Sequence, residues 1–402
     1  MKKIISLLLA IVMLCLCLSS CKLNIFCKHD DPAKIVFVQG KAPTDHVDGL
    51  TDGMKCTACG TMVVPQMVIQ KLIPDIDDST KNEYKLGMGV VVDLGSSHTG
   101  YFQIDATVAT VVLDDSGKIV ACRLDAVYNR GNVYDDGTYS IINLKTKMEL
   151  GNDYNMAKYG HSNVGNETVK EWYEQAKAFE EYVVGKTVDE IANMPLQTIS
   201  NGYVISADQD LLSAGCTIHI LDFKSAVVKA CNDDQGVSFK ASRDFTLGVA
   251  ANTYDEGYYM APEDGVEIRL YSDFAASVVV GGKIVACVND GIQPRIKFDE
   301  AGEIVSTSFN GTKRELKEDF MMSVYGTGMD RNGDGIVKEW YEQSAAFSKH
   351  VVGMTADQVA GMTTKPVNGH DISADDKLLS AGCTIQITGM KEIVVKSVEN
   401  AR

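Results

Sequence analysis

Alternating apolar and polar positions predict a β-hairpin in two separate parts of the chain. In the first part, two extended, β-branched runs over 107–113 and 119–127 flank a short polar turn. In the second part, runs over 275–280 and 284–288 flank Gly281-Gly282, and two glycines suit the positive φ angles of a two-residue turn. Each pair of runs should therefore form two neighbouring strands of an antiparallel sheet.

Apolar side chains spaced about 3.6 residues apart predict an amphipathic helix after each hairpin. The predicted apolar faces comprise Val169, Trp172, Tyr173, Ala176, Phe179 and Val183 in the first helix, and Val337, Trp340, Tyr341, Ser344, Phe347 and Val351 in the second. We interpret Trp172 and Trp340 as core residues, because their place on the apolar face explains them without a cofactor. Stacking on a ligand ring is the alternative.

Helix start and stop signals recur in the same two parts of the chain. Each amphipathic helix ends at a glycine, a capping box opens a short second helix, and a polar cap precedes a last helix. These signals are Gly185, Thr187 and Asp222 in the first part and Gly353, Thr355 and Thr388 in the second, with the last helices expected over 223–230 and 390–398.

Longer segments also recur along the chain. Glu171 to Gln175 returns as Glu339 to Gln343 at an offset of 168 residues, and 117–122 and 211–218 return at offsets of 165 and 167. A period this long predicts tandem domains rather than a solenoid.

We therefore expect two tandem copies of one domain, copy one over 82–235 and copy two over 240–402. Each copy has strands first and helices later, which predicts an α+β fold for both. A small N-terminal cysteine-rich module over 21–75 is expected to precede them.

The first 20 residues have the pattern of a secretory signal. Lys2 and Lys3 precede an apolar run from Ile4 to Leu18, which is shorter than the roughly 20 residues of a membrane span. The sequence Leu18-Ser19-Ser20-Cys21 resembles the bacterial lipobox, whose cysteine becomes the lipidated first residue. We expect 1–20 to be removed and Cys21 to anchor the protein at the outer face of the cytoplasmic membrane. A plain signal peptide is the alternative.

Residues 21–75 contain a candidate zinc site. Cys27, His29, Cys56 and Cys59 supply two ligand pairs of the types that zinc prefers, and Gly60 lets backbone amides approach the thiolates. A Cys56–Cys59 disulfide, or one that includes Cys27, is the alternative. On its segments 42–44, 49–53, 56–60 and 63–66 the stretch resembles a short repeat common in surface proteins of anaerobic Gram-positive bacteria.

Charge and missing motifs exclude some function classes. The 402 residues include 38 Lys+Arg and 54 Asp+Glu, a formal net charge of −16, so binding to a phosphate backbone is disfavoured. No Walker, Rossmann or Gly-x-Ser-x-Gly pattern occurs where the strands and helices around it would support that function. The segment Asp330-x-Asn332-x-Asp334-Gly335 begins like a calcium loop, but Tyr341 stands where its last acidic ligand belongs, so we expect a solvated turn.

A glycine–cysteine–threonine segment occupies the same frame in both predicted copies. Gly215-Cys216-Thr217 follows Asp210 and Ser213, and Gly382-Cys383-Thr384 follows Asp376 and Ser380. Small residues let backbone amides face an anion, and a following helix N-terminus favours phosphate. A threonine hydroxyl there could accept a phosphoester. The alternative is a tight turn in which the cysteines simply pack.

On these residues, and on the order of hairpin, helices and late motif, both copies resemble the FMN-binding domain of extracytoplasmic flavoproteins. That family has an Asp-x-x-Ser-Gly-Ala-Thr signature, whose threonine a flavin transferase esterifies to FMN. The resemblance implies that the aspartate, serine, glycine, cysteine and threonine of each segment contact FMN. Thr217 and Thr384 would be the attachment points, with Ser213 and Ser380 as the fallback.

The leading hypothesis is thus a lipid-anchored flavoprotein that carries FMN in two tandem domains and relays electrons outside the membrane. It would be an electron carrier rather than an enzyme with its own substrate, and its partners would be a flavin transferase and redox proteins. The alternative is a non-catalytic surface lipoprotein that binds a ligand or partner without flavin. A calcium-stabilised structural module is a third class.

Overall fold

The computed structural model describes residues 29, 31–42, 49–69, 82–159, 169–200, 202–242, 244–255, 258–259, 265–325 and 330–402. The expected signal segment 1–20, the lipidation site Cys21 and the candidate zinc ligand Cys27 lie outside these residues. The chain divides into two compact units, Met1–Asp77 and Asp78–Arg402. Within the described ranges, every helix is too short or too polar to cross a bilayer.

The N-terminal unit is a small β-structure. After the 3-10 turn Pro32–Lys34, it contains β1 (Ile35–Val38), β2 (Gly49–Leu50), β3 (Gly53–Cys56), β4 (Met62–Val64) and β5 (Val68–Ile69), with the sheet orders β1-β3-β4 and β2-β5. Phe37 and Met67 are 63% and 67% exposed, whereas Cys56 is buried. Few apolar residues are buried in the described part of this unit, and small units of this kind usually need a cross-link or a bound metal for stability.

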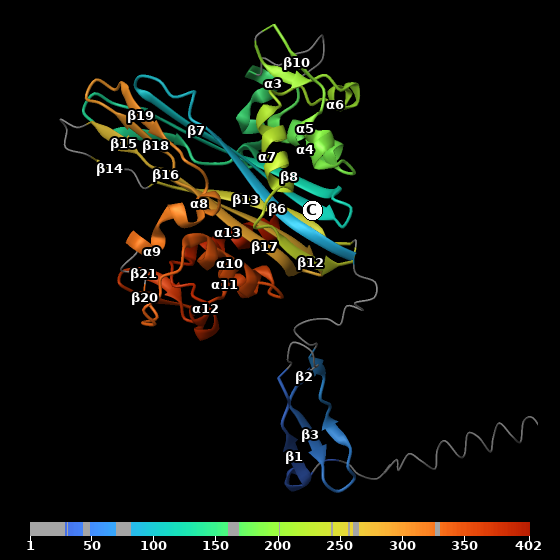
Figure 1. The fold of residues 1–402 in the computed structure, drawn as a ribbon. Helices are drawn as coiled ribbons and strands as arrows, with labels where there is room; N and C mark the ends of the chain where they lie inside the picture. The colour runs from blue at the N-terminus through green and yellow to red at the C-terminus, as the bar shows by residue number, and fades with distance from the viewer. Residues whose placement is uncertain are drawn as a thin grey trace, which may run out of the picture. The chain divides into compact units, whose positions relative to one another are not determined.

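The first half of the main unit is built on a five-stranded antiparallel sheet (Figure 1). Its strands are β6 (Asn82–Asp93), β7 (Tyr101–Asp114), β8 (Ile119–Val133), β9 (Tyr139–Asn143) and β12 (Val237–Ala241), in the order β12-β6-β7-β8-β9. The first predicted hairpin is confirmed, because β7 and β8 pair from Tyr101↔Asn132 to Leu113↔Ile119.

The second half has a three-stranded sheet in the order β13-β16-β17. Its strands are β13 (Thr246–Asp255), β16 (Leu270–Val280) and β17 (Lys283–Ile292). The second predicted hairpin is confirmed as well, since Gly281 and Gly282 turn from β16 to β17 with φ angles of 56° and 78°. A further sheet contains β14 (Tyr258–Tyr259), β15 (Val266–Ile268), β18 (Arg295–Phe298) and β19 (Ile304–Ser308).

Helices and short hairpins follow in the same order in both halves. The first half has α2 (Lys147–Leu150), α3 (Met156–Tyr159), α4 (Trp172–Val183), α5 (Val188–Ala192), β10 (Leu196–Thr198), β11 (Val204–Ser206), α6 (Gln209–Ser213) and α7 (Leu221–Cys231). The second half has α8 (Lys313–Leu316), α9 (Met322–Tyr325), α10 (Trp340–His350), α11 (Ala356–Ala360), β20 (Thr364–Val367), β21 (His370–Ser373), α12 (Asp376–Ser380) and α13 (Thr388–Glu399). A 3-10 turn follows α2 (Gly151–Tyr154) and α8 (Lys317–Phe320). This mixture of sheets and helices is compatible with the α+β class.

Several predicted helix boundaries hold and others are wrong. The capping boxes of Thr187 and Thr355 are present at α5 and α11. The predicted helical faces began too early at Val169 and Val337, because Glu171 and Glu339 cap α4 and α10 one residue before the tryptophans. Asp222 and Thr388 are not caps: Ile220 and Ile387 hold these positions, and the two polar residues lie in the first turns of α7 and α13.

The main unit has four layers, with the two sheets inside and helices on both outer faces (Figure 1). The inner faces of both sheets share one apolar cluster, which includes Leu86 and Val108 of the first sheet and Phe274 and Val278 of the second. The helices 172–231 cover the outer face of the first sheet, and the helices 340–399 cover that of the second. The halves therefore bury part of their apolar surface against each other.

Glycines allow α7 and α13 to lie directly on the sheets. A Cβ atom at Gly87 of β6 would lie 2.1 Å from the Ala230 carbonyl oxygen of α7, and one at Gly248 of β13 would lie 1.9 Å from the Ser397 carbonyl oxygen of α13. Both distances are well inside van der Waals contact, so only glycine fits at these two crossings.

Candidate functional site

The two glycine–cysteine–threonine segments lie in tight turns after α6 and α12. Gly215 and Gly382 have φ angles of 86° and 88°, in the left-handed region that glycine adopts freely. Cys216 and Cys383 are fully buried in the apolar clusters beneath the helices, and burial raises the pKa of each thiol to about 12. These cysteines are inert core residues in the described fold.

The threonines of both segments are held by a buried glutamine. The Thr217 amide donates to Gln175 Oε1 at 2.8 Å, and the Thr384 amide donates to Gln343 Oε1 at the same distance. Thr217 is 8% exposed and Thr384 1% exposed. Because both threonines are buried, a phosphoester at either hydroxyl would require the turn to open.

The other motif residues lie on a different side of the turn. Asp210 and Asp376 belong to the first turns of α6 and α12, Ser213 and Ser380 end these helices, and all four are exposed. The turn itself is covered by a lysine, since Lys170 Nζ donates to the Ala214 carbonyl oxygen, as Lys338 Nζ does to that of Ala381, each at 3.0 Å. The structure therefore does not bring the acidic and hydroxyl groups of each motif into one cavity.

Each motif leads directly into a pocket, and the two pockets are built from corresponding residues. The first has a volume of about 320 Å³ and its walls include Asp105, Lys147, Tyr154, Trp172, Ile218 and Phe223. The second has a volume of about 330 Å³ and its walls include Asp273, Lys313, Phe320, Trp340, Ile385 and Met390. Ile218 and Ile385 immediately follow the motif threonines. We call these two cavities the tryptophan pockets.

A lysine–aspartate pair lies at the wall of each tryptophan pocket. Lys147 Nζ is 3.3 Å from Asp105 Oδ1, and Lys313 Nζ is 3.8 Å from Asp273 Oδ1. Burial alone would lower the pKa of Lys147, but the charge of Asp105 raises it overall, so the ammonium group stays protonated. Burial raises the pKa of Asp273, and the charge of Lys313 opposes that effect.

Aromatic rings surround both ammonium groups. Lys147 Nζ lies 6.0 Å from the centre of the Trp172 ring and 5.4 Å from that of Tyr154. Lys313 Nζ lies 5.0 Å from the centre of the Trp340 ring and 6.0 Å from that of Phe320. Cation–π attraction of this kind fixes the position of the charge without neutralising it. The interpretation of both tryptophans as core residues is confirmed, since they are 1% and 6% exposed, and they also line the pockets.

The two pockets differ in formal charge. The first contains Asp222 in addition to its lysine–aspartate pair, whereas the second contains Arg331. Arg331 is 9% exposed, its Nη1 donates to the Thr384 carbonyl oxygen at 2.8 Å, and its buried Nε has no hydrogen-bond partner among the described residues. With the one histidine of each pocket taken as neutral, the residues that line the second pocket have a formal charge of +1 and those that line the first have a formal charge of −1.

The predicted solvated turn positions this arginine. The Asp330 carboxylate accepts the amides of Gly333 and Gly335 at 2.9 and 3.1 Å. Asn332 donates to the Leu379 carbonyl oxygen at 3.2 Å, which ties the turn to α12. The prediction of a turn is confirmed, and its structural role is to present Arg331 to the pocket.

The lysine–aspartate pairs were missed from the sequence. A signal was available, because Thr146-Lys147-x-Glu149 recurs as Thr312-Lys313-x-Glu315, at an offset of 166 residues, and each forms a capping box. Asp105 and Asp273 also share an offset of 168, but alternation along a strand does not tell which polar residue faces a pocket.

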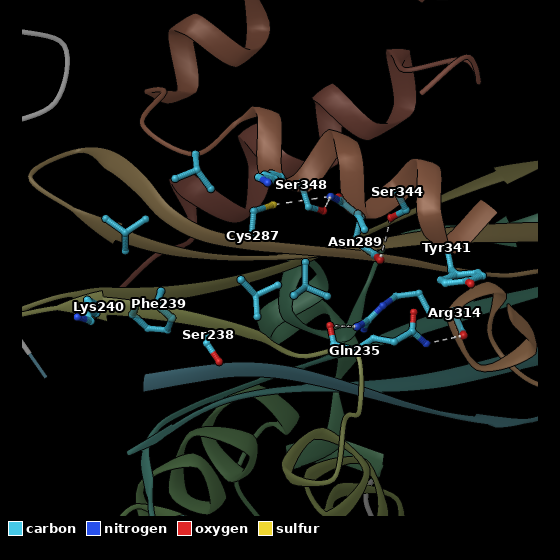
Figure 2. Close-up of a pocket in the computed structure, with 16 residues that line it drawn as sticks. Gln235, Ser238, Phe239, Lys240, Cys287, Asn289, Arg314, Tyr341, Ser344 and Ser348 are labelled. Atoms are coloured by element: carbon cyan, nitrogen blue, oxygen red, sulfur yellow. Dashed lines mark hydrogen bonds between the residues drawn. The ribbon is translucent and has the colours of Figure 1, made fainter. Parts of the chain in front are cut away.

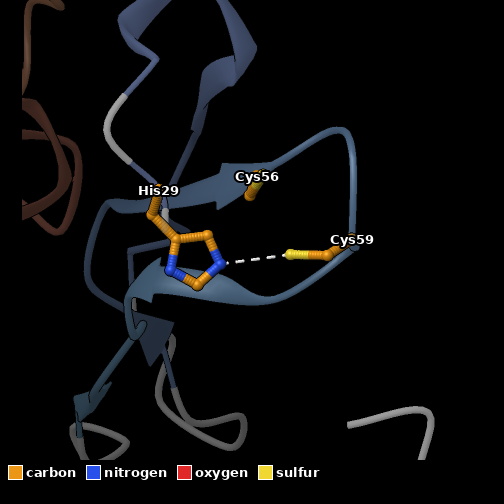
Figure 3. A group of neighbouring side chains, drawn as sticks. All are labelled: His29, Cys56 and Cys59. Carbon is orange, nitrogen blue, oxygen red and sulfur yellow. Dashed lines mark hydrogen bonds between the residues drawn. The ribbon is translucent and has the colours of Figure 1, made fainter. Parts of the chain in front are cut away.

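In the N-terminal unit, three of the candidate metal ligands lie together (Figure 3). Their ligand atoms in His29, Cys56 and Cys59 are all within 4.8 Å of one another, and His29 Nε2 is 3.2 Å from Cys59 Sγ. Gly60 has a φ of 77°, and its amide donates to the Cys56 carbonyl oxygen at 2.8 Å, which closes the knuckle. This cluster could hold a metal ion. The cysteines in the described ranges form no disulfide with one another.

Comparison with protein-family models, with curated proteins and with solved structures finds no match to this chain.

Proposed function

We propose that the main unit binds a small molecule with an aromatic ring in each of its two tryptophan pockets. The observation that carries this proposal is the recurrence of one constellation: an ammonium group paired with a carboxylate beside an indole ring in both halves. Concave sites with aromatic walls and a few fixed polar groups are typical of ligand binding. Core packing alone does not require a lysine–aspartate pair at the corresponding place in both halves.

The correspondence of the halves supports two tandem copies of one domain. The order of helices and short hairpins from α2 to α7 repeats from α8 to α13, and the sequence offsets agree to within three residues. Duplication of a binding domain gives one pocket per copy, with scope for the pockets to diverge. The pockets have diverged in their additional charged residue, which is Asp222 in the first pocket and Arg331 in the second.

FMN is the ligand to test first. The isoalloxazine ring suits aromatic walls, and Lys313 with Arg331 would hold its phosphate in the second pocket. Bound in this way, FMN would supply reversible electron transfer, and the protein would position it and exclude water. Buried Thr217 and Thr384 favour non-covalent over covalent attachment, although Ser213 and Ser380 are accessible to a flavin transferase. The second candidate is a flavin-free binding protein, which the tryptophan pockets support equally.

The cell-surface setting forms part of the same proposal. Removal of 1–20 and lipidation of Cys21 would hold the pockets at the outer face of the cytoplasmic membrane, where redox proteins or soluble ligands reach them. In the N-terminal unit, Cys27 would complete a zinc site with His29, Cys56 and Cys59. Zinc would cross-link a unit that buries few apolar side chains.

Titration with FMN and with uncharged riboflavin tests the proposal. The chain has two tryptophans, one in each tryptophan pocket, so Trp172→Phe leaves fluorescence from the second pocket alone and Trp340→Phe from the first alone. We expect quenching by at least one flavin, with FMN binding tighter than riboflavin in the second pocket. Lys313→Met should weaken binding there about tenfold or more, and Lys147→Met should not.

Two outcomes separate the candidates. A protein that is purified yellow, or whose intact mass includes one or two FMN adducts after co-expression with a flavin transferase, supports the electron carrier. If the protein is colourless and neither flavin quenches its tryptophan fluorescence, the flavin proposal is wrong. A panel of other aromatic ligands then tests the proposal of a flavin-free binding protein.

A further inference from the structure

A third cavity lies away from the tryptophan pockets, between β12, β17 and α10 (Figure 2). Its volume of about 640 Å³ is nearly twice that of either tryptophan pocket and falls within the range of small-molecule sites. Apolar side chains form much of its wall, namely Val237 and Phe239 of β12, Val285 and Val288 of β17, and Val352. We call it the inter-half cavity, because both halves of the main unit line it.

A buried side-chain carbonyl oxygen in this cavity has no hydrogen-bond partner among the described residues. Asn289 is 3% exposed, and its Nδ2 donates to Ser348 Oγ at 2.7 Å (Figure 2). Its Oδ1 is buried and accepts no hydrogen bond from any described residue. An unpaired buried carbonyl oxygen costs free energy, so such groups usually have a partner. A ligand N–H or O–H group would supply it.

The corresponding place in the first half has a different chemistry. Leu124 corresponds to Asn289 and Glu180 to Ser348. Glu180 is paired with Arg402 at 2.9 Å and with Arg123 at 3.5 Å. The second half has small neutral polar groups in place of this network, which leave room for a ligand.

Two lysines give the cavity a positive rim. Lys240 of β12 and Lys349 of α10 line it and are exposed, and neither is in an ion pair with a residue in the described ranges. Arg314 also lines the cavity, but Asp233 and the Gln235 carbonyl oxygen already occupy its guanidinium. In a chain with a net charge of −16, two uncompensated lysines at one cavity favour an anionic group there.

We propose that the inter-half cavity binds an amphipathic organic acid. Its ring or hydrocarbon body would lie against Phe239 and the valines, an N–H or O–H group would donate to Asn289 Oδ1, and its acid group would face Lys240 and Lys349. This site is separate from the tryptophan pockets and does not rest on the function proposed for them.

A matched pair of fluorescent probes tests the three features separately. Anilinonaphthalene sulfonate has an apolar body, an N–H donor and an anion, and N-phenylnaphthylamine lacks only the anion. Titrated into the full mature chain, both should bind. Asn289→Leu, which installs the residue of the first half, should weaken both by about tenfold. Lys240→Gln with Lys349→Gln should weaken the sulfonate alone.

Matched variants distinguish binding at this site from nonspecific binding of the probes. Asn129 is also a buried asparagine with an unpaired Oδ1, but it lies outside the cavity, so Asn129→Leu should leave probe affinity unchanged. Val352 lies at the rim of the cavity and is 45% exposed. Val352→Trp should fill the cavity and abolish the probe binding that Asn289→Leu weakens, in a protein with an unchanged unfolding temperature. Unchanged affinity in both Asn289→Leu and Val352→Trp, or a loss on Trp172→Phe instead, would overturn the proposal.

Discussion

The guanidinium of Arg314 donates to both carboxylate oxygens of Asp233, at 3.1 and 3.2 Å. Arg314 belongs to α8 of the second half, and Asp233 follows α7 of the first half. Their side chains are 8% and 7% exposed, and Asp233 also accepts the Met88 amide of β6 at 3.0 Å. This buried pair therefore joins the halves at the point where the chain passes from one to the other.

Removal of one partner should destabilise the main unit strongly. Arg314→Met leaves the Asp233 carboxylate buried without its counter-ion, and we expect a loss of about 3–5 kcal/mol in the free energy of unfolding. Urea unfolding followed by circular dichroism measures it. Lys317 provides the control, because its ion pair with Asp234 is exposed, and Lys317→Met should leave the midpoint nearly unchanged. Equal effects of both changes would contradict the assignment.

The pH dependence of stability should reflect two corresponding buried carboxyl groups. Burial raises the pKa of Asp125 to about 7 and that of Asp290 to about 6, from 3.8. A raised folded-state pKa means that the stabilising contribution is present at low pH and is lost as pH rises through about 4 to 7. Asp125→Asn should therefore match wild type near pH 4 and exceed it above pH 7, by at most about 4 kcal/mol.

Thermal unfolding of wild type and Asp125→Asn across that pH range measures the difference. Asp136→Asn is the matched control, because the Thr138 hydroxyl lowers the pKa of this exposed carboxyl group. Its contribution has the opposite sign and is lost as pH falls. A constant difference between wild type and Asp125→Asn at all pH values would show that Asp125 is not protonated in the folded state.

Gly87→Ala should loosen the contact between β6 and α7. The new Cβ would meet the Ala230 backbone at 2.1 Å, and backbone cannot rotate away, so we expect a loss of about 3 kcal/mol, at the upper end for overpacking. Gly361→Ala is the control, because Gly361 has helical φ and ψ angles and a new Cβ there would lie 3.2 Å from the Asp357 carbonyl oxygen. Differential scanning calorimetry compares the variants.

Zinc content should depend on the knuckle cysteines. Cys59→Ser in the full chain should remove bound zinc, measured by elemental analysis after dialysis, because a serine hydroxyl is a far weaker zinc ligand than a thiolate. Cys231→Ser, a change at a cysteine of α7 in the main unit, should retain it. Absence of zinc from wild type purified with added zinc would leave the alternative of a disulfide that includes Cys27.

Local signals predicted the strands and helices well where one residue type fixes the backbone. Gly281-Gly282 specifies a tight turn, and Thr187 and Thr355 specify helix starts through side-chain oxygens. The caps at Asp222 and Thr388 were wrong because the helices begin one or two residues earlier, directly after Ile220 and Ile387, and such boundaries are the least certain part of a prediction from sequence.

The candidate sites were harder to predict for the same reason. Thr217 follows a glycine and a cysteine in a pattern that suits either an anion site or a tight turn, and the choice depends on Gln175, which is 42 residues away. The ammonium group of Lys147 meets Asp105 only after a strand and a short helix pack together. Sequence recurrence marks such residues as important to the fold but does not say which of them meet.

The apolar cluster shared by the two sheets also has a consequence during synthesis. When the ribosome has made the chain as far as α7, the inner face of the first sheet has no partner, and Leu86 and Val108 remain open to solvent until β13, β16 and β17 are complete. An incomplete chain therefore presents a broad β-rich surface to its neighbours, the kind that aggregates. Completion of the second half is thus a protective step for the first.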